Sequence, residues 1–363
     1  MKFPAWLGFP LRAFPAAVRA GAIGVAATVF TWIGVRVWHH DPRPRIFLLG
    51  DSFIGNYRYA PGTRLEDDLA RLEPDCRVDN WAQSGAEPLD FLLQMYRGRM
   101  LAGKPRTVII ALSADKFLAH ERRPRACARG INLGWLPWDR VGWRLVRSMP
   151  AREQGIALVQ KAALCFFGMA DAINAVWRER VDWNQNRRRM RQASGSRHRQ
   201  ILERAKEKLA FLDSMKVPSQ QAYAGLPFAR DAAFMLHGLR EEGIDTRVVL
   251  LPWGNPEVYA RVCTAKALAA RDSVTERMRA WLRDQNVPVL DLTSPAELAH
   301  FPGRAWDDAN HPKDAAVFEY MSHRIAETWP RPGEGPAGAV AAFESDDAEP
   351  ANGAWEPGET DGT

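Results

Sequence analysis

Four short apolar runs, each ended by polar or turn-forming residues, constrain the fold of this chain more than any other feature. They are RIFLLGDS from Arg45, TVIIALSADKF from Thr107, TRVVLLPWGNP from Thr246 and VPVLDLT from Val287. Near-continuous apolar runs of this length are typical of parallel strands that are buried on both faces. The segment CRVDNWAQSG, from Cys76, predicts one further strand.

Helical periodicity separates these runs. The predicted helices span Thr63 to Leu72, Ala229 to Glu242, Asp272 to Gln285 and Asp314 to Trp329. Strands that alternate with helices predict an α/β fold around a parallel sheet. At 363 residues the chain is long enough for one enlarged domain, which we place at 44–330.

Residues 118–225 interrupt this alternation and are interpreted as a helical insertion. The segment carries tryptophans, an apolar helical run from Ile156 to Trp177 and six arginines between Arg187 and Arg199. Buried tryptophans and a solvated charged helix face explain this composition in the plainest way. A cap over an active site, or a surface that docks on a membrane, is the more specific alternative.

The N-terminal residues 1–43 contain an apolar segment from Ala20 to Trp38, close to the roughly 20 residues that cross a bilayer. We interpret it as a retained transmembrane anchor, since no small-residue cleavage site follows it. A buried N-terminal helix is the alternative. Residues 331–363 are rich in Gly, Pro, Ala and acidic residues and are predicted to be a disordered tail.

Composition argues against several other functions. The net charge is +6, yet no zinc-finger spacing or RNA-binding aromatic motif accompanies the arginines, so nucleic acid is not predicted as a partner. The four cysteines, at 76, 127, 165 and 263, form no CxxC pair, although two disulfides remain open. No phosphate-binding glycine motif or HExxH is present, so no cofactor or metal is predicted.

The first candidate for chemistry is the Gly50-Asp51-Ser52 sequence at the end of the first predicted strand. The carboxyl ends of parallel strands are where such sheets present reactive groups. A serine hydroxyl is a weak nucleophile unless a base accepts its proton, so this interpretation requires a histidine elsewhere in the chain. By itself the sequence is equally common as a plain turn.

The second candidate is Asp308-Ala309-Asn310-His311, just before the last predicted helix. At this spacing Asp308 can accept the Nδ1 proton of His311 and leave Nε2 to act as a general base. A helix cap with an exposed histidine would have the same spacing. The third candidate is Gly85, in the loop NWAQSG after the second strand, whose unshielded backbone N–H suits an oxyanion hole.

Together the three blocks resemble the SGNH (GDSL-like) hydrolase superfamily, over about residues 44–330 apart from the insertion. That resemblance implies a three-layer, flavodoxin-like parallel sheet. It also implies a triad of Ser52, His311 and Asp308, with Ser52 and Gly85 donating backbone N–H groups to the oxyanion. The expected activity is that of a serine esterase that forms an acyl-enzyme and acts on acyl esters, with O-acetyl esters as the expected class.

One block departs from the family pattern. SGNH proteins usually have GxND after the third strand, whereas this chain has Leu112-Ser113-Ala114-Asp115. The asparagine donor is absent, and the loss of one such donor typically costs about 2.7 to 4 kcal/mol in the barrier. Ser113 is the nearest hydroxyl and is our candidate for a substitute donor.

A second, looser resemblance is carried by architecture alone. An N-terminal anchor followed by an SGNH-type domain is similar to bacterial envelope proteins that work beside membrane-bound O-acyltransferases on polysaccharides. It implies an inner-membrane protein with an extracytoplasmic domain and a glycan or other acyl ester as substrate. Transfer of the acyl group to a polysaccharide, or a catalytically degenerate scaffold that partners a membrane acyltransferase, are the alternatives to hydrolysis.

Overall fold

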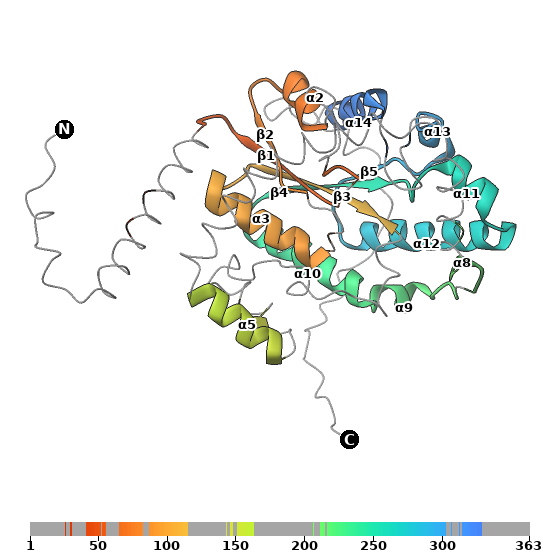
Figure 1. The fold of residues 1–363 in the computed structure, drawn as a ribbon, viewed down its shortest axis with the longest axis horizontal. Coiled ribbons are helices and arrows are strands. Elements are labelled where there is room, and N and C mark those ends of the chain that lie inside the picture. The colour runs from red at the N-terminus through yellow and green to blue at the C-terminus, as the bar shows by residue number, and fades with distance from the viewer. Residues whose placement is uncertain are drawn as a thin grey trace, which may run out of the picture.

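The computed structural model describes residues 26, 30, 41–51, 53–55, 65–82, 86, 88–114, 143, 146–147, 151–162, 206, 211–214, 216–302, 306, 312 and 314–328. Within these residues the chain forms one α/β unit whose sheet lies between two layers of helices (Figure 1).

The sheet has five parallel strands, so the predicted α/β fold with a parallel sheet is confirmed. Its strands are β1 (Arg45–Leu49), β2 (Arg77–Asn80), β3 (Thr107–Ser113), β4 (Asp245–Leu251) and β5 (Val289–Asp291). Their spatial order is β2-β1-β3-β4-β5, which is the flavodoxin-like order. This order reverses between β1 and β3, and ligands of open α/β sheets bind outside the carboxyl ends of the strands at such a point.

The apolar runs form this sheet because their side chains are buried on both faces. Along β1, Phe47 and Leu49 belong to one buried cluster, and Leu48 belongs to a second cluster. The strands β3 and β4 alternate in the same way. Side chains of successive strand residues point to opposite faces, so two apolar cores form, one on each side of the sheet.

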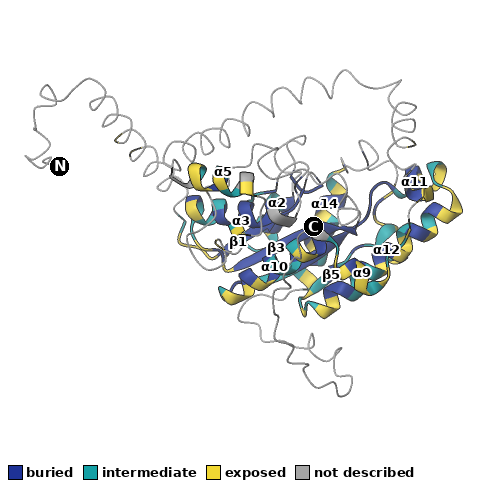
Figure 2. Cartoon of the chain, turned by 90° about the horizontal axis from the view of Figure 1, so that it is seen from below, coloured by how far each residue is buried: buried dark blue, intermediate teal, exposed yellow. Residues whose placement is uncertain are grey.

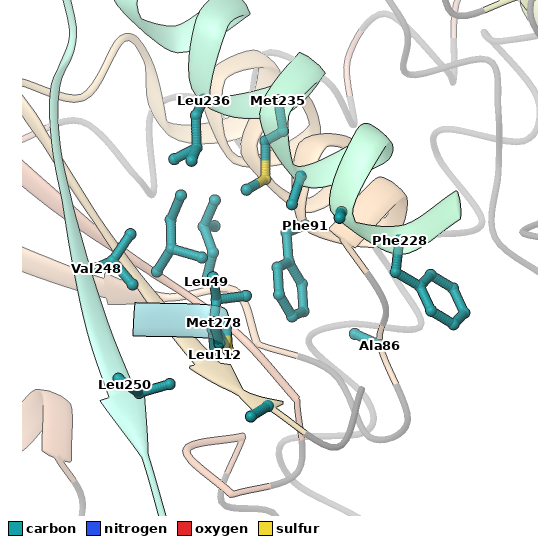
Figure 3. Close-up of a cluster of buried hydrophobic side chains, with 14 of the residues drawn as sticks. Leu49, Ala86, Phe91, Leu112, Phe228, Met235, Leu236, Val248, Leu250 and Met278 are labelled. Carbon is teal, nitrogen blue, oxygen red and sulfur yellow. The ribbon is translucent and has the colours of Figure 1, made fainter. Parts of the chain in front are cut away.

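The larger core lies between the sheet and α3 (Pro88–Ala102), α10 (Pro227–Glu241) and α12 (Ala265–Asp284). In Figure 3, Met235 and Leu236 of α10 and Phe91 of α3 lie beside strand residues such as Leu49, and Phe228 lies farther along α10. The smaller core lies between the other face and two helices, α2 (Leu65–Leu72) and α14 (Ala315–Thr328). Figure 2 shows the corresponding pattern, with buried strands and exposed outer faces on the helices.

The four predicted helices correspond to α2, α10, α12 and α14. The helix α12 begins at Ala265, seven residues before the predicted start, because Thr264 caps it by accepting a hydrogen bond from the Ala267 N–H. The short helices α11 (Pro256–Val262) and α13 (Pro295–Leu298) were not predicted. The short helices α8 (Phe211–Ser214) and α9 (Gln220–Ala224) fall within 118–225, which was predicted to be helical without individual bounds there.

The longest helix without a prediction is α3, which follows the Gly85 segment. Its apolar residues are spread around the helix, with buried Phe91, Leu92 and Leu93 in succession, and so give little helical periodicity. Gly98 lets α3 approach the sheet closely, because a Cβ there would lie 2.7 Å from atoms of both Phe47 and Trp81.

Most of the predicted insertion lies outside the described residues. Within 118–225 the structure describes α5 (Ala151–Ala162), α8, α9 and a few further residues. Ala157 of α5, Leu212 of α8 and Tyr223 of α9 are buried in the larger core. These three helices therefore pack on the same face of the sheet as α3 and α10.

The predicted anchor, 20–38, and the tail, 331–363, also lie outside the described residues, apart from Ala26 and Phe30. Among the helices that the structure describes, none combines the length and the apolar character needed to span a bilayer. Cys76 and Cys263 are both free thiols. Cys127 and Cys165 are not described, so the predicted possibility of disulfides is not tested for them.

Ion pairs and polar hydrogen bonds hold the edge of the sheet where the strands begin, which we call the amino edge. The buried Arg45 donates to Asp79 at 2.7 Å, and Arg77 donates to the same carboxylate at 2.9 Å. Arg77 also pairs with Asp41, which accepts hydrogen bonds from the backbone and side chain of Arg43. The residues that lead into β1 are therefore tied to β2.

Candidate active site

The chain makes one tight turn directly after β1, at the opposite edge of the sheet, which we call the carboxyl edge. The Gly55 N–H donates to the Asp51 carbonyl at 2.9 Å, and the Asp51 carboxylate accepts from the Phe53 N–H at 2.8 Å. An aspartate that bonds the backbone two residues ahead stabilises a turn. Ser52 is the one residue of this turn, 51–55, that lies outside the described residues.

The loop after β2 is fastened to this turn. Asn80 Nδ2 donates to the Ile54 carbonyl at 2.8 Å, and Asn80 Oδ1 accepts from the Ala82 N–H at 3.0 Å. A Cβ on Gly55 would lie 2.9 Å from the Asp51 carbonyl and 3.1 Å from the Ala82 carbonyl. Glycine at position 55 therefore permits the backbones of the turn after β1 and of the NWAQSG segment to meet.

An aromatic contact joins the turn to the segment that contains the predicted acid–base pair. The rings of Phe53 and Trp306 meet edge to face, with centroids 5.6 Å apart, and both side chains are buried. Trp306 also pairs with Pro312 through an isolated antiparallel bridge. Asp308 and His311 lie between Trp306 and Pro312 in the sequence, so this bridge brings together the two ends of the segment that contains them.

Trp306, at the start of this segment, is connected to α14 through Phe301. The Trp306 Nε1–H donates to the Phe301 carbonyl at 3.2 Å, and the fully buried Phe301 ring packs edge to face against Tyr320 of α14. Tyr320 in turn stacks on His300, with ring centroids 4.0 Å apart. Trp306 is thus held by aromatic rings and by the bridge to Pro312.

Hydrogen bonds between α13 and α14 support the same region. Tyr320 donates to one oxygen of Glu297 at 2.5 Å, and Arg324 donates to the other oxygen at 2.9 Å. Burial, together with the hydrogen bond to Glu297, raises the pKa of Tyr320 to about 12. The phenol therefore stays protonated at neutral pH and keeps donating to the carboxylate.

Ser113 is the last residue of β3, beside β1 in the sheet, and it is buried. It lies in register with Leu251, the last residue of β4. Hydrogen bonds also fix the segment after β4. Trp253 Nε1 donates to Thr275 at 3.0 Å, and Asn255 caps α11. The turn after β1 and the end of β3 therefore flank the point where the strand order reverses.

Of the predicted site residues, the structure describes Ser113 alone. Ser52, Gly85, Asp308 and His311 lie outside the described residues, so the triad and the oxyanion donors remain predictions. Asn80 belongs to the predicted NWAQSG segment, but the contacts that Phe53, Asn80 and Trp306 make between the blocks were not predicted. Their contacts are between residues far apart in sequence, which no local pattern reveals.

Within the described part of the chain, no group of three or more His, Cys, Asp or Glu side chains is arranged to hold a metal ion. Around the turn after β1, the described residues of the carboxyl edge are joined mainly by backbone turns, amide hydrogen bonds and aromatic contacts. Carboxylates also take part, since Asp51 accepts from the Phe53 N–H, Glu66 accepts from Asn80 and Asp291 at the end of β5 pairs with Arg279.

No family model and no curated protein matches the chain. Solved structures that are similar to it include the following three. One, described as a lipolytic protein of the G-D-S-L family from Desulfitobacterium hafniense, is 12% identical, with coverage of 78% of this chain and 99% of that one and a TM-score of 0.37. A second, described as an acylhydrolase from Bacteroides fragilis, is 10% identical, with coverage of 79% of this chain and 88% of that one and a TM-score of 0.35.

The third, described as a GDSL-like lipase from Parabacteroides merdae, is 13% identical, with 78% and 94% coverage and a TM-score of 0.38. Identities and TM-scores this low set no function. The chain is similar, among solved structures, to GDSL-like lipolytic proteins and acylhydrolases.

Proposed function

We propose that this protein is a serine ester hydrolase of the SGNH type that removes acyl groups, O-acetyl groups above all, from a cell-envelope glycan. Ser52 is the nucleophile, His311 is the general base and Asp308 orients the imidazole. The backbone N–H groups of Ser52 and Gly85, with the Ser113 hydroxyl, stabilise the oxyanion.

The contact between Phe53 and Trp306 carries this proposal. Ser52 is adjacent in sequence to Phe53, and His311 is adjacent to Pro312, which pairs with Trp306. Consecutive Cα atoms are about 3.8 Å apart. One ring contact and one backbone bridge therefore connect the immediate neighbours of the two groups that must exchange a proton. A serine needs such a base within reach to become a nucleophile.

The proposed reaction follows from these roles. His311 Nε2 accepts the Ser52 hydroxyl proton as Oγ bonds to the acyl carbon and the carbonyl oxygen takes the negative charge. The bond from the acyl carbon to the leaving oxygen breaks, and His311 returns its proton to the departing alcohol. Water then attacks the acyl carbon of the acyl-enzyme while His311 accepts one of its protons. The bond from the acyl carbon to Ser52 Oγ breaks, His311 returns the proton to Oγ, and the carboxylic acid leaves.

The position of the amino edge supports a glycan rather than a bilayer lipid as the substrate. We propose that 20–38 is a membrane anchor and that the domain is extracytoplasmic. The chain enters the sheet at Asp41 to Arg45, where ion pairs fasten it. The proposed site lies at the other end of β1, and five strand residues span roughly 16 Å. A site at that edge faces away from the point where the anchor joins.

The first test is labelling with a fluorophosphonate, which reacts with activated serines. The wild type should be labelled, whereas Ser52→Ala and His311→Ala should not be. Hydrolysis of 4-nitrophenyl acetate should fall by roughly 10⁶-fold in Ser52→Ala. Ser273→Ala is the matched control, because Ser273 is an exposed serine of α12 and should leave the rate unchanged.

Product analysis with an acetylated glycan separates hydrolysis from transfer, which shares the same acyl-enzyme. Release of free acetate is the expected result. Acetate that moves to an added acceptor glycan instead would replace hydrolysis with acyl transfer. An unlabelled wild type that releases no acetate would contradict the enzyme assignment and favour a scaffold.

A further inference from the structure

We propose that Gln94 of α3 is a positioning residue that holds the turn carrying Ser52 through the backbone of Gly50, an inference that rests on the proposed function. Gln94 is 3% exposed and lies between Leu93 and Met95, which both belong to the larger apolar core. Burying a carboxamide in such surroundings is unfavourable unless its polar atoms are hydrogen-bonded. Its bonding partners therefore indicate its role.

Both polar atoms of the Gln94 side chain bind the same backbone residue. Gln94 Oε1 accepts from the Gly50 N–H at 3.3 Å, and Gln94 Nε2 donates to the Gly50 carbonyl at 3.2 Å. A carboxamide carries an acceptor and a donor on neighbouring atoms, whereas a carboxylate only accepts and an apolar side chain does neither. The pair of bonds therefore depends on an amide at position 94.

The end of β2 explains why Gly50 needs this partner. The Leu48 carbonyl accepts from the Trp81 N–H at 2.9 Å, so the polar groups of Leu48 face β2. In a strand these directions alternate along the chain, and those of Gly50 face the same side as those of Leu48. The strand β2 ends at Asn80, the register partner of Leu48. The amide of Gln94 takes the place of the missing strand beside Gly50.

Gly50 passes this restraint to the turn. A Cβ at Gly50 would lie 2.9 Å from the Ile54 side chain and 3.3 Å from the Ala111 side chain. The backbone of Gly50 is thus enclosed by Gln94, by Ile54 of the turn and by Ala111 of β3. A shift of Gly50 displaces Ile54, which lies in the same turn as Ser52.

Gln94 also connects two blocks of the proposed site. The helix α3 begins at Pro88, three residues after Gly85, and Gly50 lies two residues before Ser52. The hydrogen bonds between Gln94 and Gly50 therefore set how the helix after the proposed oxyanion donor lies against the strand that leads to the nucleophile. Displacements near 1 Å in such constellations cost up to about 100-fold in rate.

The test compares Gln94→Met, which keeps the length of the side chain and removes both hydrogen bonds, with Phe91→Leu on the same helix. Phe91 is buried in the same core and is not among the partners of Gly50, so its truncation loosens packing only. Two quantities are measured at a matched folded fraction. They are the rate of fluorophosphonate labelling and the amide hydrogen exchange of the peptide 49–56.

In Gln94→Met we expect labelling to slow by about tenfold to a hundredfold and exchange in 49–56 to accelerate. Phe91→Leu should lower the unfolding midpoint and leave both quantities unchanged. Gln94→Glu keeps the acceptor for the Gly50 N–H and should fall between wild type and Gln94→Met. It also supplies the comparison with wild type should Gln94→Met fail to fold.

Labelling and exchange that remain at wild-type values in the Gln94 variants would overturn the inference. An inert wild type would instead defeat the proposed function, and hydrogen exchange would then decide on Gln94 alone. If exchange in 49–56 were unchanged in the Gln94 variants, Gln94 would not restrain the turn. Faster exchange confined to that peptide would support the restraint.

Discussion

The two edges of the sheet are held together by different chemistry. At the amino edge, charged side chains bind one another, as in Arg45 with Asp79, Arg77 with Asp41, and Arg99 with Glu242. At the carboxyl edge an ion pair between Arg279 and Asp291 lies at the end of β5, but the turn after β1 is joined to its neighbours mainly by hydrogen bonds to backbone atoms and by packed rings. Examples are Asn80 on the Ile54 carbonyl and Phe53 against Trp306.

This difference teaches where geometry matters. The ion pairs of the amino edge lie far from the proposed site, and removal of one partner of a buried pair mainly costs stability. Bonds to backbone atoms and edge-to-face rings fix the positions of the segments that they join. The carboxyl edge is therefore built for a fixed arrangement of loops, and the amino edge for stability. Substitutions at the two edges should separate activity from stability.

The largest effect after loss of the triad is expected for Ser113→Ala at the carboxyl edge. Removing an oxyanion donor lowers kcat by about 10²- to 10³-fold, whereas KM should change little, because the charge forms only in the transition state. Steady-state hydrolysis of 4-nitrophenyl acetate measures both. A kcat equal to that of wild type would show that Ser113 does not replace the missing asparagine.

Trp306→Ala should follow, with a loss of about 100-fold in labelling rate. It removes the ring against Phe53 and loosens the loop that carries Asp308 and His311. Truncating a buried aromatic side chain also costs about 3 to 5 kcal/mol in unfolding free energy. Trp306→Phe preserves a ring contact and should recover most of the rate at a matched folded fraction. If Trp306→Ala and Trp306→Phe were both labelled at the wild-type rate, the contact between Phe53 and Trp306 would not be needed for the activity of the site.

Arg45→Met should show the opposite pattern at the amino edge. Removing one partner of a buried pair is expected to cost on the order of 3 kcal/mol in unfolding free energy, even though Arg77 still binds Asp79. The labelling rate of the folded fraction should not change. Glu327→Gln, at the exposed pair with Arg324, is the control and should cost less than about 1 kcal/mol. A slower labelling rate in Arg45→Met would contradict this separation and show that the amino edge also affects the site at the carboxyl edge.

The smallest effects are expected in the pH dependence of the thermal midpoint. Hydrogen bonds from Arg43 hold the pKa of Asp41 well below its usual range, so its contribution is present above the unfolded pKa and is lost as pH falls. The pKa of Tyr320 is raised to about 12, mainly by burial, so its contribution is present below pH 10 and is lost as pH rises toward 12.

Melting curves between pH 3 and pH 11 compare the two groups directly. Asp41→Asn should flatten the acid limb of the wild-type profile, and Tyr320→Phe should flatten the alkaline limb, each by a few degrees. A Tyr320→Phe profile that follows wild type above pH 10 would contradict the proposed contribution of the hydrogen bond between Tyr320 and Glu297 to stability.

The sequence was sufficient to predict the sheet. Buried strands such as β3 and β4 are continuous apolar runs, and their length and termination are local properties that a sequence displays directly. The helices α2, α10 and α14 were predicted because their apolar residues recur at helical spacing.

The contacts that join the blocks could not be predicted in the same way. The helix α3 is largely buried and therefore has little polar periodicity, so Gln94 was not recognised as part of the site. Phe53 and Trp306 are 253 positions apart, and their contact depends on how α14 packs on the sheet. The triad and Gly85 remain predictions, supported by the order and spacing of the blocks.

The most direct test of the central claim is a crystal structure of the protein after reaction with a phosphonate. We predict a covalent bond from Ser52 Oγ to phosphorus, with His311 Nε2 within about 3.2 Å of the phosphonate or serine oxygen. Phosphonate on another residue, or an imidazole more than roughly 10 Å from Ser52 in the folded protein, about three times hydrogen-bond reach, would contradict the account.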